Sequence, residues 1–195
     1  MEISLANQVA LITGSSSGIG AGIAKSMAES GATVIINYPY DGALSDAEGV
    51  LKEITDNGGK GMVCKCDVSK EDEVIKMFED VVSAYGTVDI LVNNAGIQKD
   101  SKFEEMSLDK WNAVIGVNLT GQFLCAREAI KVFLKRGIDK SRSVTCGKII
   151  HTSSVHEIIP WGGHANYASS KGAIRMLMQT LAQEFGDRKI RVNSI

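Results

Sequence analysis

The sequence has little that would suit it to nucleic acids or membranes. Its 21 Lys and Arg against 23 Asp and Glu leave a net charge of −2, so there is no basic field to attract a nucleic acid or an anionic lipid surface. The apolar start is too short to span a bilayer, and no basic flank precedes a cleavage-like site. We therefore expect a cytoplasmic protein with a small-molecule substrate and no nucleic-acid or membrane partner.

Cysteine is also scarce. The four cysteines stand at positions 64, 66, 125 and 146, and without an export signal a disulfide framework loses its main support. Cys64 and Cys66 lie in a strand-like run with no second pair at a zinc-finger spacing, so core packing is favoured over zinc. The three histidines, His151, His156 and His164, match no recognised ligand spacing. We expect reduced thiols and no metal site.

The chain alternates short apolar runs with longer helical patterns. The strand-like runs are Val9 to Thr13, Thr33 to Asn37, Gly61 to Cys66, Val88 to Asn93, Gly147 to Ser153 and Ile190 to Ile195. The helix-like stretches are Gly20 to Glu29, Ala43 to Asn57, Lys70 to Tyr85, Ser107 to Lys135 and Tyr167 to Phe185. This order, with strands that read as continuous apolar runs, predicts a single α/β domain over residues 1–195 with a doubly wound parallel sheet in a three-layer α/β/α arrangement.

A glycine-rich segment follows the first strand directly and opens into a helix. Glycines let the backbone turn tightly and approach a diphosphate, and the unpaired amides of a helix N-terminus favour negative charge. The spacing G-x-x-x-G-x-G differs from the common G-x-G-x-x-G fingerprint, so the loop alone leaves an ordinary Gly/Ser turn open. Its place between a strand and a helix favours a dinucleotide site. The candidate contacts in this loop are Gly14, Ser16, Ser17, Gly18, Ile19 and Gly20.

The end of the second strand leaves the choice of dinucleotide open. An Asp or Glu at this position would bind the adenosine ribose of NAD, but the chain has Asn37 followed by Tyr38. No arginine follows to favour the 2′-phosphate of NADP, and the segment Ser15 to Ser17 holds no basic residue. Asn37 and Tyr38 are the candidate cofactor contacts here, with either NAD or NADP as cofactor.

Tyr167 and Lys171 are four residues apart at the start of a helical stretch, which places them on one face. A free phenol is a poor base at neutral pH, but a nearby ammonium group stabilises its ionised form. Tyr167 is thus a candidate general acid/base. A surface Tyr and Lys that share a helix by accident remain the alternative for this pair taken alone.

The motifs Thr13 to Gly20, Asn93-Asn94-Ala95-Gly96 and Tyr167-x-x-x-Lys171 occur in one chain and in this order. Together they make the chain, along all 195 residues, resemble the classical short-chain dehydrogenase/reductase family. Ser154 precedes Tyr167 by 13 positions, as the family pattern expects. The resemblance implies a Rossmann-like fold and an NAD- or NADP-dependent oxidoreductase that acts on an alcohol or carbonyl group.

The resemblance also implies roles for individual residues. Ser154 would hydrogen-bond the substrate oxygen, Tyr167 would exchange a proton with it, and Lys171 would assist Tyr167 and hold the nicotinamide ribose. Asn118 resembles the helix-kinking asparagine whose backbone carbonyl holds a water on a relay to Lys171. The further cofactor contacts implied are Asp67, Val68, Asn94, Ala95 and Gly96. Taken singly, Asn118 could be a buried hydrogen-bonding residue and Asp67 a turn or cap.

A narrower resemblance, to bacterial glucose 1-dehydrogenases, concerns the substrate. It rests on Ser153-Ser154-Val155-His156-Glu157, Ile159-Pro160-Trp161 and Met106-Ser107-Leu108 with Trp111. It implies a sugar such as glucose, contacted by Gln98, Ser154, His156 and Tyr167. His156 could equally be a structural loop histidine. A 3-oxoacyl-thioester reductase is the alternative within the same family.

The resemblance finally bears on the end of the chain and on assembly. The sequence stops inside a strand-like run, whereas family members continue with a Pro-Gly turn, a substrate-capping segment and another strand, so we expect these parts to be missing here. Should the protein end at Ile195, a non-catalytic nucleotide-binding module is the alternative.

The resemblance also implies a homodimer or homotetramer in which the helices Ser107 to Lys135 and Tyr167 to Phe185 pack against symmetry mates.

Overall fold

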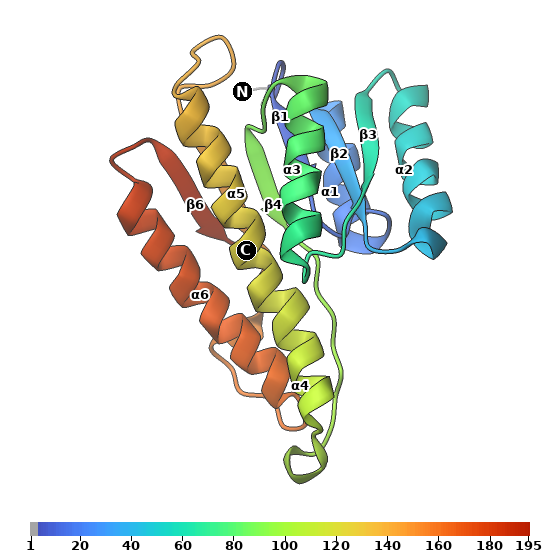
Figure 1. Cartoon of the computed structure of the whole chain (residues 1–195), viewed down its shortest axis with the longest axis vertical. Helices are drawn as coiled ribbons and strands as arrows, with labels where there is room; N and C mark the ends of the chain where they lie inside the picture. Colours follow the sequence, from blue (N-terminus) through green and yellow to red (C-terminus); the bar gives the residue numbers. More distant parts are fainter. Residues whose placement is uncertain (1–3) are drawn as a thin grey trace.

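The computed structural model describes residues 4–195, which form one six-stranded parallel sheet with helices on both faces (Figure 1). The strands are β1 (Val9–Ile12), β2 (Thr33–Tyr38), β3 (Lys60–Lys65), β4 (Ile90–Asn93), β5 (Gly147–His151) and β6 (Ile190–Ser194). Their order in the sheet is β3-β2-β1-β4-β5-β6. The chain reverses its direction of winding between β1 and β4, and doubly wound sheets bind ligands at this switch point. The predicted Rossmann-like α/β fold is confirmed.

The helices form the two outer layers. Helices α1 (Gly18–Glu29) and α2 (Leu44–Asp56) pack against one face of the sheet. Helices α3 (Glu71–Tyr85), α5 (Gly121–Arg136) and α6 (Ala165–Phe185) pack against the other. Helix α4 (Leu108–Ile115) and α5 extend below the sheet in Figure 1, beside the first turns of α6. Short 3-10 turns at Asp41–Ala43, Phe103–Glu105 and Val155–Glu157 complete the fold.

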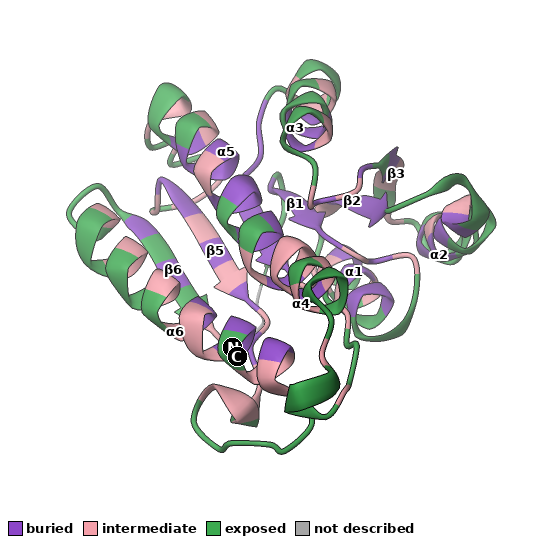
Figure 2. Ribbon diagram, turned by 60° about the horizontal axis from the view of Figure 1, so that its bottom comes forward, coloured by how far each residue is buried: buried purple, intermediate pink, exposed green. Residues whose placement is uncertain are grey.

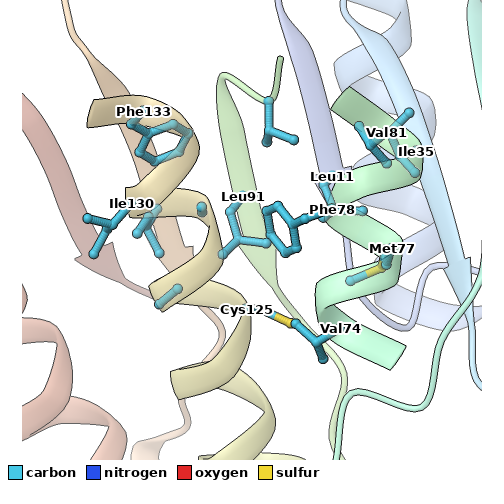
Figure 3. Close-up of a cluster of buried hydrophobic side chains, with 14 of the residues drawn as sticks. Leu11, Ile35, Val74, Met77, Phe78, Val81, Leu91, Cys125, Ile130 and Phe133 are labelled. Carbon is cyan, nitrogen blue, oxygen red and sulfur yellow. The ribbon is translucent and has the colours of Figure 1, made fainter. Parts of the chain in front are cut away.

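The central strands are buried on both sides because their side chains alternate between two cores. In β1, Val9 and Leu11 join the core under α3 and α5, while Ala10 and Ile12 join the core under α1 and α2. Figure 3 shows part of the first core, and Figure 2 shows buried strands between partly exposed helices. This two-sided burial explains why the strands read as continuous apolar runs.

The four cysteines are buried free thiols in the first core. Burial raises the pKa of Cys64 to about 11 and that of Cys125 to about 12, and it raises the pKa of Cys66 as well. These thiols therefore stay protonated at neutral pH and pack as small apolar groups.

The prediction of one continuous helix over Ser107 to Lys135 is wrong at its centre. The structure has α4, then a π-helical turn over Gly116–Thr120, and then α5. A π turn inserts extra backbone into the helix and is common at functional sites. Asn118 lies in this turn and is fully buried. Hydrophobic periodicity does not reveal such a turn, because the residues on both sides of it are helical.

Among residues 4–195, no helix is long and apolar enough to cross a bilayer. The cytoplasmic location stays a prediction. Within the same residues, no group of three or more His, Cys, Asp or Glu side chains is placed to hold a metal ion.

Candidate active site

The glycine-rich loop turns sharply between β1 and α1. Gly14 has φ +62° and Gly18 has φ +56°, a conformation that favours glycine. A Cβ on Gly20 would lie 2.4 Å from the Gly14 carbonyl oxygen, so the loop packs on itself too closely for a side chain there. Within the described chain, the side chain of Ser17 does not cap the amides of α1, which it precedes. These amides are available to an anion.

This loop forms one wall of a cavity of about 320 Å³ at the carboxyl ends of the central strands. Seven of the predicted cofactor residues line it: Gly14, Asn37, Asp67, Val68, Asn94, Ala95 and Gly96. Ser17, Gly18 and Ile19 lie exposed on the loop, and Ser16 is half-buried. An uncapped helix N-terminus beside this cavity suits the diphosphate and adenosine of a dinucleotide.

Thr13 joins the glycine loop to the segment after β4. Its hydroxyl oxygen accepts hydrogen bonds from the backbone amides of Asn94 and Ala95, at 2.9 and 3.0 Å. The Asn94 side chain donates to the carbonyls of Thr13 and Gly14, at 3.0 and 3.2 Å. Two walls of the cavity are thereby held together. Thr13 was not among the predicted site residues, although it stands first in the loop motif.

Asn37 faces inward from the end of β2. Its Oδ1 accepts a hydrogen bond from the Gly14 amide at 2.9 Å, and its Nδ2 donates to the Cys66 carbonyl at 2.9 Å. The residue is only 1% exposed, so its amide supports the loop from behind. The prediction that it contacts the cofactor stays a prediction.

Tyr40 lines the cavity, whereas the predicted cofactor contact Tyr38 does not. Tyr38 is buried among the core residues under α1 and α2. Tyr40 is 64% exposed and lines the cavity together with Pro39. Tyr40 could be expected here because it lies just beyond the end of β2. Tyr38 is the last residue of the strand and packs into the core, whereas Tyr40 lies outside the strand and is exposed.

Asp67 has a turn-forming role in addition to its place in the cavity wall. Its Oδ1 accepts hydrogen bonds from the amide and hydroxyl of Ser69, at 3.0 and 2.8 Å. Its own amide donates to a carboxylate oxygen of Glu73 at 2.8 Å. Val68 is buried beside Gly121, where a Cβ would lie 2.7 Å from a Val68 methyl group. Helix α5 therefore approaches the cavity wall closely.

Helix α6 and the 3-10 turn Val155–Glu157 bring the predicted catalytic residues together. The Lys171 Nζ lies 5.4 Å from the centre of the Tyr167 ring and donates a hydrogen bond to the Thr152 carbonyl at 2.8 Å. Burial lowers the pKa of Lys171 to about 8. The Ser154 hydroxyl accepts a hydrogen bond from the His156 amide at 3.2 Å and begins the turn that packs against α6.

The backbone around Tyr167 is held by two neighbouring polar side chains that the sequence analysis missed. Asn166 is fully buried; its Oδ1 accepts from the Tyr167 amide at 2.8 Å, and its Nδ2 donates to the Lys99 carbonyl at 2.9 Å. Ser170 donates its hydroxyl to the Tyr167 carbonyl at 2.7 Å. Both residues lie within one helical turn of Tyr167, and this proximity was the only feature of the sequence that pointed to them.

Asn118 connects the π-helical turn to the segment after β4. Its side chain exchanges two hydrogen bonds with the backbone of Ile97, at 2.8 and 3.0 Å, and donates to the Ser170 hydroxyl at 3.3 Å. Gln98 follows Ile97 and is exposed. The segment that carries Gln98 is therefore anchored on both sides, by Asn118 at Ile97 and by Asn166 at Lys99.

His156 lies beside Tyr167, with 6.4 Å between the ring centres and an angle of 70° between the rings. Its Nδ1 is 2.9 Å from the Ile159 carbonyl oxygen, so Nδ1 carries the hydrogen and Nε2 of the neutral ring is an acceptor. The arrangement thus joins an ionisable phenol, a buried amine, a hydroxyl and an imidazole. Together they can exchange a proton with an oxygen and hold that oxygen by hydrogen bonds.

Comparison with known proteins identifies the family. The model of the family described as short chain dehydrogenase matches residues 8–195. The chain belongs to the short-chain dehydrogenase family. It is similar to 3beta-hydroxysteroid dehydrogenase 1 of Eggerthella lenta, with 43% identity over 194 residues that cover 98% of this chain and 70% of that protein.

Other relatives of this short-chain dehydrogenase carry different names. Glucose 1-dehydrogenase 2 of Bacillus subtilis is 38% identical over 98% of this chain and 71% of that protein. A 3-oxoacyl-[acyl-carrier-protein] reductase of Synechocystis is also 38% identical, over 98% of this chain and 73% of that protein. A gluconate 5-dehydrogenase from Burkholderia cenocepacia, crystallised with NADP and tartrate, has a TM-score of 0.88 and 32% identity, covering 99% of this chain and 71% of that one.

These comparisons confirm the family that the motifs indicated. They do not single out one substrate for this short-chain dehydrogenase, since the named relatives act on steroids, sugars and acyl thioesters at 38–43% identity.

Proposed function

We propose that this short-chain dehydrogenase is an oxidoreductase that transfers a hydride between NAD or NADP and an alcohol or carbonyl carbon of a small molecule. The observation that carries the proposal is the placement of Tyr167 beside the buried amine of Lys171, with Nζ 5.4 Å from the ring centre. A gluconate 5-dehydrogenase of similar fold was crystallised with NADP, which supports the cofactor class.

A bound nicotinamide dinucleotide supplies or accepts the hydride. Tyr167 gives a proton to the substrate oxygen in reduction and takes it back in oxidation. The amine of Lys171, whose Nζ faces the Tyr167 ring, would assist this proton exchange electrostatically. The Ser154 hydroxyl hydrogen-bonds the same oxygen and holds it against Tyr167. The backbone carbonyl of Asn118, whose side chain donates to the Ser170 hydroxyl, would hold the water of the proposed relay to Lys171.

The residues proposed to hold the dinucleotide lie on the glycine loop and around the 320 Å³ cavity. Gly14, Ser16, Ser17, Gly18, Ile19 and Gly20 would bind the diphosphate, and Asp67, Val68, Asn94, Ala95 and Gly96 the adenosine side. Lys171 would hold the nicotinamide ribose. Residues 1–195 would thus act as the dinucleotide-binding domain.

We propose a sugar such as glucose as the substrate, contacted by Gln98 and His156. The acceptor Nε2 of His156 beside Tyr167 suits a hydroxyl-rich ligand. The relationship to glucose 1-dehydrogenase 2 supports this choice. The alternative substrate is a 3-oxoacyl thioester, which the equally similar Synechocystis reductase favours. The alternative of another class is a nucleotide-binding module without turnover.

The test is a set of initial rates with glucose, a second aldose, a 3-oxoacyl thioester and a 3β-hydroxysteroid, each with both dinucleotides. We expect sugar oxidation, and we expect His156→Ala to raise the sugar KM more than Val155→Ala does. Thioester or steroid turnover without sugar turnover rejects the sugar. Dinucleotide binding without any turnover supports the module instead.

We also propose that the protein assembles as a homodimer or homotetramer through α5 and α6. A groove between these helices carries Phe123 and Leu134, which are 44% and 40% exposed, together with Leu181 and Phe185. Arg127 and Glu184 lie in the same groove, so a two-fold related copy could meet both charge signs. Light scattering should give a dimer or tetramer, and Phe123→Glu should yield monomers. A monomeric parent protein would contradict this assembly.

A further inference from the structure

A stack of three aromatic rings lies over the loop between Ser154 and Tyr167. Trp161 stacks on His156 and on His164, with ring centres 4.4 Å and 3.4 Å away and angles of 22° and 7° between the rings. His156 in turn lies edge-on beside Tyr167. Trp161 therefore connects the two histidines, while 42% of its surface stays exposed.

His164 fixes the far end of this stack to another part of the chain. Its Nε2 is 3.2 Å from Oδ2 of Asp100, and its Nδ1 is 2.9 Å from the Gly162 carbonyl oxygen. Nδ1 therefore donates a hydrogen bond to the Gly162 carbonyl, and Nε2 faces the Asp100 carboxylate.

Backbone contacts hold the same two segments together. The Ser101 amide donates to the Gly163 carbonyl at 3.0 Å, and the ammonium of Lys110 donates to the Asp100 carbonyl at 3.1 Å. Asp100 is therefore tied to α4, and the loop of Trp161 is tied to Asp100. The chain of contacts runs from α4 through Asp100, His164 and Trp161 to His156.

We propose that Asp100, His164 and Trp161 form a clamp that positions His156 beside Tyr167 and so sets the affinity for the substrate without touching it. The inference rests on the proposed function, because it assigns the clamp to the substrate side of that site. The three residues are positioning residues. Their loss should raise KM and leave the proton exchange at Tyr167, and hence kcat, nearly unchanged.

The first measurement is the fluorescence of Trp161 in a Trp111→Phe background, where it is the only tryptophan of the chain. The emission maximum of an indole moves to longer wavelength when the ring becomes more exposed to water. His164→Ala removes the imidazole that stacks on Trp161, and Asp100→Ala removes the carboxylate that His164 faces. Both should therefore shift the emission maximum to longer wavelength. Asp109→Ala, an exposed acid on α4 that none of the stack contacts involve, is the matched control and should leave it unchanged.

The second measurement compares the change in KM with the change in kcat for the same variants. Because single partly exposed contacts contribute little each, we expect KM to rise about three- to tenfold and kcat to stay within about twofold. Emission that matches the control in both variants overturns the clamp. Emission shifted to longer wavelength with an unchanged KM overturns its positioning role. A parent protein that turns over no substrate rejects the proposed function instead, while the emission still reports whether the clamp forms.

Discussion

Replacing Lys171 by Met should stabilise the protein at neutral pH while removing its proposed activity. Lys171 is 4% exposed, and burial lowers its pKa from 10.5 to about 8. In the unfolded chain the amine regains its ordinary value. Holding the charge inside the folded protein below pH 8 therefore costs about 3 kcal/mol. Methionine has a similar length and no charge to bury.

The net gain should be smaller than this cost. The Lys171 Nζ donates a hydrogen bond to the Thr152 carbonyl, which the variant loses. That carbonyl keeps a second, weaker donor in Gln122 Nε2 at 3.5 Å. Taking about 1–2 kcal/mol for the lost bond, we expect Lys171→Met to be more stable by about 1–2 kcal/mol at pH 7.

The dependence on pH gives the sharper test. Between about pH 8 and 10.5 the unfolded Lys171 binds more protons than the folded one, so the free energy of unfolding of the parent protein rises with pH across this window. Urea titrations at pH 7 and pH 10, without nucleotide, should show the advantage of the variant shrinking or reversing. Other groups titrate equally in both proteins and cancel. A constant difference between the two proteins, or an advantage of the variant that grows from pH 7 to pH 10, would refute the reasoning.

Three further changes follow from contacts around the site. Gly20→Ala should weaken dinucleotide binding more than tenfold in a fluorescence titration, since its Cβ would lie 2.4 Å from the Gly14 carbonyl oxygen; binding at the parent level would show that the loop adapts. Asn37→Asp should lower the free energy of unfolding by about 1–3 kcal/mol in urea titrations, because the variant loses the donor to the Cys66 carbonyl and buries a charge. An unchanged urea midpoint together with tighter NAD binding would contradict the structural role of the buried Asn37 amide. Burial lowers the pKa of His151 from 6.5 to about 4, so the folded protein should lose up to about 3 kcal/mol as the pH falls through that window. His151→Asn should lose less stability between pH 7 and 4, whereas parallel acid curves would exclude His151 as the cause.

The strands and the placement of Tyr167 and Lys171 were predictable because each depends on a short local pattern. Continuous apolar runs marked β1 and β2, and the four-residue spacing placed Tyr167 and Lys171 on one face of α6. The glycine loop was recognisable for the same reason, since its turn and its helix start are adjacent in the chain.

Features set by contacts between distant segments were not predictable from those patterns. The inward turn of Asn37 depends on acceptors and donors from Gly14 and Cys66, which lie on other elements. The π-helical turn at Asn118 depends on the backbone of Ile97. The residues adjacent to Asn37 and Asn118 in the sequence do not reveal these hydrogen-bond partners.

The stack of His156, Trp161 and His164 could not be predicted from the sequence either. His164 and Asp100 are separated by more than sixty residues and meet only because α6 begins beside the segment after β4. The spacing of the histidines excluded a metal pattern but carried no information on ring stacking. Only the fold brings His156, Trp161 and His164 into contact.

The central claim is that Tyr167 exchanges a proton with the substrate beside a bound dinucleotide, and Tyr167→Phe tests it most directly. The comparison is the steady-state rate of hydride transfer on whichever substrate the parent protein turns over, together with the dinucleotide Kd of both proteins. We predict a loss of about 10²- to 10⁴-fold in kcat with a Kd within about twofold, as expected for the removal of a general acid/base. A variant that keeps its full kcat would contradict the claim.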